Sequence, residues 1–257
     1  MQILIITDLE GPAGVERFSQ TRAEPFVAAA KCLLTNEVNA AIAGIIDVDP
    51  QAVIHVVDGH GSGGINKEDM DQRGVYIRPG SSEALRDKWD KYDAYMYVGQ
   101  HAMAGTAKAT LSHTQSSKYV VYQKLNGVFI GEFGRGAARA GYHGVPTVFI
   151  AGDDKAVAEA QGLIPGIYGV ITKWGEGWQK ARHLSPEESC RRIREVIAEA
   201  CRNIHKIKPL RFDPPYSSEH RFTRPRTAVP TAKPGVRVEL VDPYTVRYRS
   251  DHFEILP

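Results

Sequence analysis

Short apolar runs of strand length recur along the chain and alternate with longer segments of helical periodicity. The runs occupy residues 3–6, 52–57, 94–99, 119–125, 127–132 and 146–152. Apolar residues recur at helical spacing over residues 24–46, 152–164 and 184–205. Strands that are apolar on both faces and alternate with helices are typical of a parallel sheet covered on both sides. The pattern therefore predicts an α/β fold with a mostly parallel sheet flanked by helices.

Capping signals mark the beginnings of the two later helices. Ser185 suits an N-cap, Pro186 suits the first turn, and Glu188 completes a capping box. In "GDDKAVAEAQ" the two acids at 153–154 fit a turn and N-cap, where they favour the positive end of the helix dipole.

The composition changes near residue 207. Six of the 15 prolines lie between Pro209 and Pro234, and polar and apolar residues then alternate in "VRVELVDPYTVRYRS". Alternation of period two around a turn predicts an antiparallel hairpin. We therefore expect an α/β domain over residues 1–206 and a smaller C-terminal α+β or antiparallel domain over residues 207–257.

Composition and charge narrow the class of protein. Hydrophobic residues make up 42% and charged residues 24%, as in ordinary globular chains, and the net charge of +2 gives no sign of nucleic-acid binding. The three cysteines form no C-x-x-C pair, which argues against a zinc–thiolate site or a disulfide framework. No apolar run is long enough to span a bilayer. We expect a soluble, cytoplasmic protein with neither nucleic acid nor membrane as a partner.

Ionisable side chains cluster after the predicted strands. They are Asp8, Glu10, Asp58, His60, His101, His113 and Glu132. Each one alone is explained more simply by a structural role, such as capping a turn. The carboxyl ends of parallel strands meet at one edge of the sheet, however, so these side chains are expected to converge there. Imidazoles and carboxylates without thiolates suit zinc or another divalent transition metal, and a carboxylate such as Asp8 can bridge two ions.

The motifs around these residues resemble those of the zinc-dependent D-aminopeptidase family. The resemblance runs from residue 3 to about residue 190, through "TDLEG", "DGHGSG", "VGQHAMAGT", "LSHT", "GEFGRGAARAGYHGVPTVFIAGDD" and "HLSPEES". It implies two zinc ions per chain, with Asp8 as the bridging ligand. It also implies that Glu10 and His60 complete one metal site, and that His101 and Glu132 complete the other.

The same resemblance implies a function and an assembly. His113 matches the histidine with the catalytic role, and the expected reaction is hydrolysis of short peptides with a free amino terminus, including D-amino-acid peptides. The family forms homo-oligomeric rings. Its members continue beyond the position of Pro257, so the small domain is expected to be shortened here.

Two other functions remain open from the sequence. "TDLEG" and "AGDDKAVAEA" are similar to the acidic motifs of magnesium-dependent phosphatases of the haloacid-dehalogenase type, with Asp153 and Asp154 as magnesium ligands. That chemistry uses Asp where this chain has Glu10, and it leaves the histidines without a role. A non-catalytic protein that keeps a metal-binding scaffold is the second alternative. Two roles are equally compatible with Trp174 and Trp178: they could belong to the core or line a substrate pocket.

Overall fold

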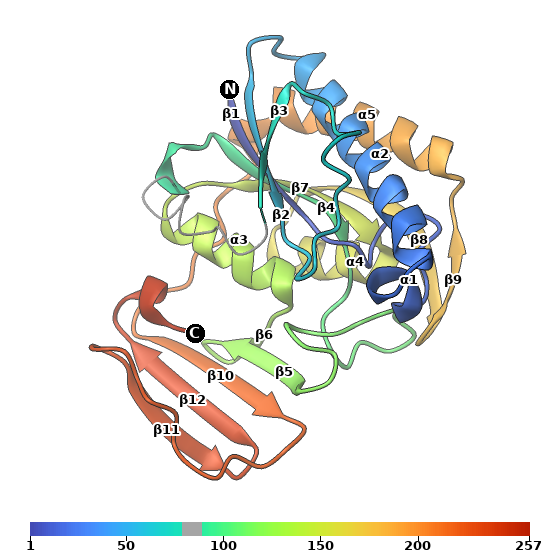
Figure 1. Cartoon of the computed structure of the whole chain (residues 1–257). Coiled ribbons are helices and arrows are strands. Elements are labelled where there is room, and N and C mark those ends of the chain that lie inside the picture. The colour runs from blue at the N-terminus through green and yellow to red at the C-terminus, as the bar shows by residue number, and fades with distance from the viewer. Residues whose placement is uncertain (79–88) are drawn as a thin grey trace.

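The computed structural model describes residues 1–78 and 89–257, and these residues form two sheets (Figure 1). Sheet A has seven strands within this part of the chain, and all neighbouring pairs are parallel except β8 with β9. In spatial order they are β3 (Gly74–Ile77), β2 (Val53–Asp58), β1 (Gln2–Thr7), β4 (Ala94–Gln100), β7 (Thr147–Asp153), β8 (Tyr168–Gly177) and β9 (Lys180–His183). The predicted mostly parallel sheet is confirmed.

Helices flank sheet A on both faces. They are α1 (Phe18–Arg22), α2 (Phe26–Ile46), α3 (Glu132–Tyr142), α4 (Asp154–Leu163) and α5 (Pro186–Arg202), with 3-10 turns η2 (Trp89–Lys91), η3 (Ile204–Lys206) and η4 (Phe253–Ile255). Helices α2 and α5 pack against each other on one face, and α3 lies on the opposite face, where it contacts α4 (Figure 1). Right-handed crossovers produce this division, because the chain moves from β1 to β2 in one direction and from β4 to β7 in the other.

The core explains the near-continuous apolar runs. Ile3 and Ile5 of β1 are fully buried in the same cluster as Leu34 of α2, whereas Leu4 packs with Tyr95 in a second cluster. Because both faces of the central strands are covered, successive side chains are apolar in both directions.

Both predicted N-caps are confirmed, but the Glu188 carboxylate accepts from Arg191 and Arg192 and does not complete the predicted capping box. The Ser185 side chain accepts a hydrogen bond from the Glu188 backbone N–H at 3.2 Å. Asp153 is the N-cap of α4, and its Oδ1 accepts hydrogen bonds from the N–H groups of Lys155 and Ala156 at 2.9 and 3.0 Å.

The predicted strand over residues 127–132 is wrong for most of its length. Strand β6 includes only Val128–Phe129, and Glu132 begins α3 instead of ending a strand. The sequence pattern does not indicate α3, because its glycines lower helix propensity. Tertiary packing requires at least one of them. A Cβ atom on Gly141 would lie 1.7 Å from the Leu210 carbonyl oxygen.

Sheet B is antiparallel. Within the described residues its order is β11 (Arg237–Asp242), β12 (Thr245–Ser250), β10 (Tyr216–Phe222), β5 (Val120–Leu125) and β6. The β11–β12 pair confirms the predicted hairpin. Strands β5 and β6, which the apolar pattern groups with the parallel strands, join sheet B instead, because β5 pairs antiparallel with β10. A division into two domains at residue 207 stays a prediction.

The order of strands creates a switch point at β1. Strand β1 lies between β2 and β4, so the chain leaves it toward opposite edges of the sheet and opens a crevice at the carboxyl ends of the strands. Gly99 lets the two segments approach. Its φ is +81°, and a Cβ atom there would lie 2.0 Å from the Asp8 carbonyl oxygen.

Candidate metal centre

Asp8 and Glu10 lie in the loop that leaves β1 at the switch point. Their residues are 6% and 1% exposed. Asp8 Oδ1 accepts a hydrogen bond from the Leu9 N–H at 2.8 Å, but neither carboxylate oxygen of Glu10 has a hydrogen-bond partner in the part of the chain that the structure describes. Two carboxylates withdrawn from water in the same loop need a positively charged partner.

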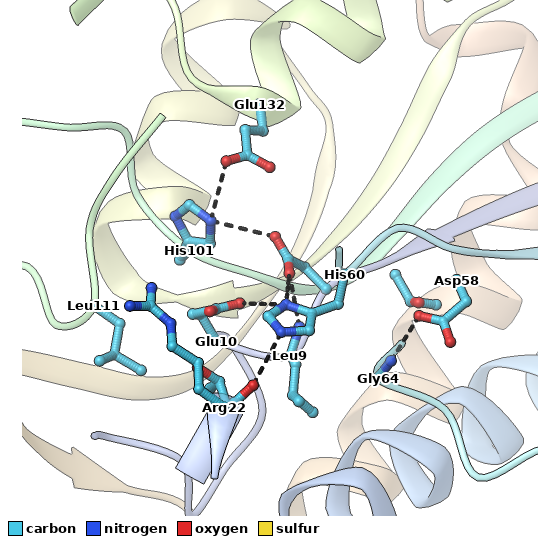
Figure 2. A network of polar contacts seen from close by, with 12 residues as sticks. Leu9, Glu10, Arg22, Asp58, His60, Gly64, His101, Leu111 and Glu132 are labelled. Atoms are coloured by element: carbon cyan, nitrogen blue, oxygen red, sulfur yellow. Dashed lines mark hydrogen bonds and ion pairs between the residues drawn. The ribbon is translucent and has the colours of Figure 1, made fainter. Parts of the chain in front are cut away.

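Two imidazoles from neighbouring strands face Asp8. His60 follows β2, and its Nδ1 lies 3.2 Å from Asp8 Oδ1 and 3.1 Å from Glu10 Oε2. His101 follows β4, and its Nε2 lies 3.2 Å from Asp8 Oδ2. The two oxygens of Asp8 therefore face two different histidines. Figure 2 shows His60, Glu10, His101 and Glu132 turned toward the same space.

Glu132 and His113 complete the second half of the centre. Glu132 Oε1 lies 3.6 Å from His101 Nε2 and 3.7 Å from His113 Nε2. The rings of His101 and His113 stack, with centroids 4.0 Å apart and an interplanar angle of 12°. The Gln115 N–H donates a hydrogen bond to Glu132 Oε1 at 2.8 Å, which orients the carboxylate.

The six predicted site residues form two groups around one centre. Ligand atoms within each group lie within 4.8 Å of one another; the groups are Asp8, Glu10 and His60, and His101, His113 and Glu132. The second group includes His113, so the geometry allows it as a ligand as well as a proton carrier. Which residue binds metal and which carries a proton stays a prediction.

Backbone carbonyls determine which nitrogen of each histidine is free. His101 Nδ1 lies 2.9 Å from the Ala102 carbonyl oxygen, and His113 Nδ1 lies 2.9 Å from that of Leu111. His60 uses its other nitrogen, since Nε2 lies 3.1 Å from the Thr21 carbonyl oxygen. A carbonyl can only accept, so each of these nitrogens carries the proton and donates. All three imidazoles thus turn their second nitrogen toward the carboxylates, and this is the nitrogen that would bind a metal ion after losing any proton it carries.

The electrostatics of the centre favour a cation. Burial lowers the pKa of His60, but the Asp8 and Glu10 carboxylates outweigh it and raise the pKa to about 10. Burial acts on His101 in the same way, and Asp8 again holds its pKa well above the ordinary value. Burial also raises the pKa of Glu132 to about 7. Protons on the two imidazoles therefore sit between carboxylates, in the positions that metal ions would take with release of those protons.

The donor set fits zinc. It consists of imidazole nitrogens and carboxylate oxygens, both of which zinc binds readily, and neither group in the described residues includes a cysteine. A pocket of about 480 Å³ opens onto these side chains, and its outer wall is formed by Arg22 and the segment Gln115–Lys118. The volume falls in the range of small-molecule sites, roughly 300–1,000 Å³.

Three ionisable residues hold the ligand loops: Lys173 and Glu159, which the sequence did not single out, and Asp153, which it placed at a helix N-cap. Lys173 is fully buried and donates to the backbone carbonyls of Glu10, Pro12 and Val15, which fixes the loop after β1. Nothing in the sequence marks Lys173 or Glu159, because their partners are backbone groups distant in the chain.

The other two are acids that hold the loop after β4. Glu159 accepts from the N–H groups of Met103 at 3.1 Å and Gly131 at 2.8 Å, so it joins the segments that carry His101 and Glu132. Asp153 Oδ2 accepts from the Ala102 N–H at 3.0 Å.

Other residues singled out in the sequence lie outside the ligand groups. Asp58 accepts hydrogen bonds from the Gly64 and Ile65 N–H groups, at 2.8 and 3.2 Å, and Figure 2 shows it facing Gly64. It therefore stabilises the loop that carries His60. Trp178 is 53% exposed and packs on Phe18, with ring centroids 5.1 Å apart, while Trp174 stacks under the Arg182 guanidinium at 4.0 Å.

A comparison with protein families identifies the chain. The model of peptidase family M55, described as D-aminopeptidase, matches residues 1–256. The chain belongs to the D-aminopeptidase family. The expected family membership is confirmed, and the described helices of this D-aminopeptidase family member include none that is long and apolar enough to cross a membrane.

Two relatives of this D-aminopeptidase family member are informative. A D-aminopeptidase of Bacillus subtilis (strain 168) is 35% identical over 121 residues, which are 47% of this chain and 43% of that protein. The match thus spans less than half the length of the relative.

The Zn-dependent D-aminopeptidase DppA from Bacillus subtilis, a self-compartmentalizing protease, aligns with a TM-score of 0.86 at 23% identity, over 99% of this chain and 93% of that one. The structural likeness establishes the shared α/β fold.

Proposed function

We propose that this chain is a metal-dependent aminopeptidase with two zinc ions, which hydrolyses short peptides that have a free amino terminus, including peptides that begin with a D-residue. The observation that carries the proposal is the position of Asp8. Its Oδ1 lies 3.2 Å from His60 and its Oδ2 lies 3.2 Å from His101. A carboxylate with each oxygen turned toward a separate group of donors is suited to bridge two ions.

Each group of side chains has a defined place in the proposal. Glu10 and His60 hold one ion together with Asp8, and His101 and Glu132 hold the other. Zinc, when bound, supplies Lewis acidity toward the scissile carbonyl and activates water near neutral pH. The Glu10 oxygens and His101 Nε2 form ion pairs but no regular hydrogen bond in the described residues, and in this arrangement they would serve as ligands instead.

His113 is the proton carrier in the proposal. Its Nδ1 donates to the Leu111 carbonyl oxygen, so Nε2 keeps a lone pair that faces Glu132 at 3.7 Å. In that position Nε2 can accept a proton from the attacking water and return it to the leaving amine. Phe18 packs edge-on against the ring, with centroids 6.0 Å apart, and limits its movement.

The phosphatase alternative lacks available ligands. Asp153 is occupied by three backbone N–H groups, and Asp154 accepts from the Gly175 N–H at 2.9 Å and pairs with Lys155 at 2.6 Å. The family match also groups the chain with peptidases. A non-catalytic metal-binding protein, the second alternative, would give no function to the lone pair on His113 Nε2.

Assembly into a homo-oligomeric ring is part of the same proposal, because the solved relative is described as self-compartmentalizing. Light scattering coupled to gel filtration should give a mass several times the 28.3 kDa of one chain. A monomer at all concentrations would contradict the assembly.

The activity is tested by incubating the zinc-loaded protein with D-alanylglycine, L-alanylglycine and their N-acetylated forms. We expect zinc-dependent release of alanine from a free dipeptide and none from the blocked forms. Hydrolysis of p-nitrophenyl phosphate in magnesium, without peptide hydrolysis, would favour the phosphatase instead.

A further inference from the structure

A second pocket lies on the α3 side of the metal centre. Its volume is about 390 Å³, and Asp8 and Glu132 form the wall that it shares with the centre. Tyr97, Gln100, Arg135 and Arg139 also line it. Glu132, Arg135 and Arg139 share one face of α3, because they are spaced by three and four residues.

Polar atoms in this pocket are buried and unpartnered. Tyr97 and Gln100 are 2% and 3% exposed, and neither the Tyr97 hydroxyl nor Gln100 Oε1 has a hydrogen-bond partner among residues 1–78 and 89–257. Unpartnered buried polar atoms are costly, so a group that binds them is expected. Gly136 makes room for the hydroxyl, since a Cβ atom there would lie 2.0 Å from the Tyr97 oxygen.

Within the described residues, neither arginine has a carboxylate at hydrogen-bond distance. Arg135 donates to the Leu256 carbonyl oxygen at 3.1 Å and forms no ion pair within residues 1–78 and 89–257. Arg139 Nε is buried without a hydrogen bond; its closest acid in these residues is Glu254, at 3.9 Å. Burial lowers the pKa of Arg135 to about 10, a sign that the guanidinium is poorly solvated. Two half-buried guanidinium groups beside a phenol donor are suited to an anion.

We propose that this pocket binds a carboxylate of the substrate through Arg135, Arg139 and the Tyr97 hydroxyl. The inference rests on the proposed peptidase activity, since the pocket begins at the ligands Asp8 and Glu132. The carboxylate is either the free C-terminus of a dipeptide or an acidic side chain of the residue after the cleaved bond. Both place a negative charge close to the scissile bond, and the first makes the enzyme selective for very short peptides.

The outer pocket is the competing place for a carboxylate. Arg22 lines it, but this side chain is exposed, its guanidinium donates to Ser117 Oγ at 2.9 Å, and it lies over the Phe18 ring at 4.1 Å. A solvated arginine gains less from an anion than Arg135, which is poorly solvated and forms no ion pair within the described residues. The observations therefore favour the α3 pocket.

The test compares pairs of peptides that differ only in the carboxylate. Zinc-loaded enzyme is assayed with D-alanylglycine, with D-alanylglycinamide, and with D-alanyl-glutamic acid α-amide, which keeps only a side-chain carboxylate. We expect kcat/KM for the free acid to exceed that for the glycinamide by about 10- to 100-fold, the range of a charge-assisted hydrogen bond. A rate for the glutamic acid α-amide near that of the free acid identifies an acidic side chain as a second source of the carboxylate.

Three variants locate the carboxylate. In Arg139→Gln and in the more conservative Tyr97→Phe the free-acid to amide ratio should fall toward one, mainly through KM. In Arg22→Gln the ratio should stay as in the wild type. Both peptides are assayed with the same preparation of each variant. A lower fraction of folded enzyme therefore reduces both rates equally and leaves their ratio unchanged.

The outcomes that overturn the proposal are distinct. A ratio near one in a wild type that cleaves both peptides rejects the carboxylate pocket and leaves the peptidase activity intact. A ratio that collapses in Arg22→Gln but not in Arg139→Gln moves the carboxylate to the outer pocket and rejects the α3 pocket. No cleavage of any peptide by the zinc-loaded protein rejects both the activity and the inference.

Discussion

Two acidic pairs follow parallel strands of the same sheet, and their surroundings differ. Asp153 and Asp154, after β7, are bonded to backbone N–H groups and to Lys155. Asp8 and Glu10, after β1, face imidazoles and each other, and the oxygens of Glu10 have no hydrogen-bond partner. The two pairs thus consist of similar residue types at equivalent places in the fold, but the groups that surround their carboxylates differ.

The difference separates a structural acid from a ligand acid. Backbone N–H groups satisfy a carboxylate permanently, and such an acid caps a helix or holds a loop. Asp8 has a single backbone donor, the Leu9 N–H, and Glu10 has none within the described residues, so displaceable imidazole protons or a cation must satisfy their remaining oxygens. The position after a strand does not distinguish the two; the partners of the oxygens do.

The largest expected effect comes from Asp8→Asn. An amide bridges two ions poorly, so we expect zinc per chain to fall below two and peptide hydrolysis to fall by roughly 10³-fold or more. Elemental mass spectrometry and peptide kinetics measure both. The matched control is Asp154→Asn, which keeps an acceptor for the Gly175 N–H, and which should retain its zinc and lose about 1 kcal/mol of unfolding free energy or less. Equal zinc loss in both variants would remove the distinction between the pairs.

His113→Ala tests the division of labour inside the centre. Loss of a proton carrier should lower kcat by about 10²–10⁴-fold while two zinc ions remain bound. If the variant instead binds a single ion, His113 is a ligand, as its place beside His101 and Glu132 allows.

Glu159→Gln tests an acid that holds the ligand loops without facing the metals. Its two oxygens accept from Met103 and Gly131, and an amide can satisfy only one of these N–H groups. We expect zinc affinity to weaken by about 10–100-fold at the site of His101 and Glu132, as for other groups that orient ligands. Competition with a fluorescent zinc chelator measures the two affinities; equal weakening of both ions, or of neither, would contradict this placement.

Glu37 has an environment intermediate between those of the two acidic pairs, and its titration affects stability and not catalysis. Its Oε1 accepts from the Ala13 N–H and the Ser189 hydroxyl, whereas Oε2 is unpartnered. Burial raises its pKa to about 7, above the usual value of about 4.3. The folded state thus holds the proton more tightly, and stability should fall as pH rises from about 4 to 7, at about 1.4 kcal/mol per unit of pKa difference.

Urea unfolding at several pH values tests this titration. Glu37→Gln cannot titrate, so its stability should decline less over that interval than the wild-type stability does. Parallel curves for the two proteins would show that Glu37 does not titrate there.

The sequence predicts the part of the site that depends on strand periodicity. Asp8, His60 and His101 lie directly after apolar strands, and parallel strands bring their carboxyl ends together whatever the details of packing. Glu132 reaches the same centre by a different route, as the first residue of α3. The family motifs include it, but the periodicity misplaced it on a strand.

The sequence does not predict the roles of residues whose partners are distant in the chain. Lys173 and Glu159 are ordinary polar residues in a strand and a helix, and nothing near them in the chain shows that they are buried beside the loops after β1 and β4. Arg135 and Arg139 likewise look like the solvent-facing positions of a helix. Their burial depends on how α3 packs against sheet A and on the C-terminal segment that carries Leu256 and Glu254.

The most direct test of the central claim is the zinc content of protein purified without chelator, counted per chain by elemental mass spectrometry. The account predicts about two zinc ions per chain, restored by added zinc after removal with a chelator. No bound transition metal, and none taken up when zinc is added, would contradict it.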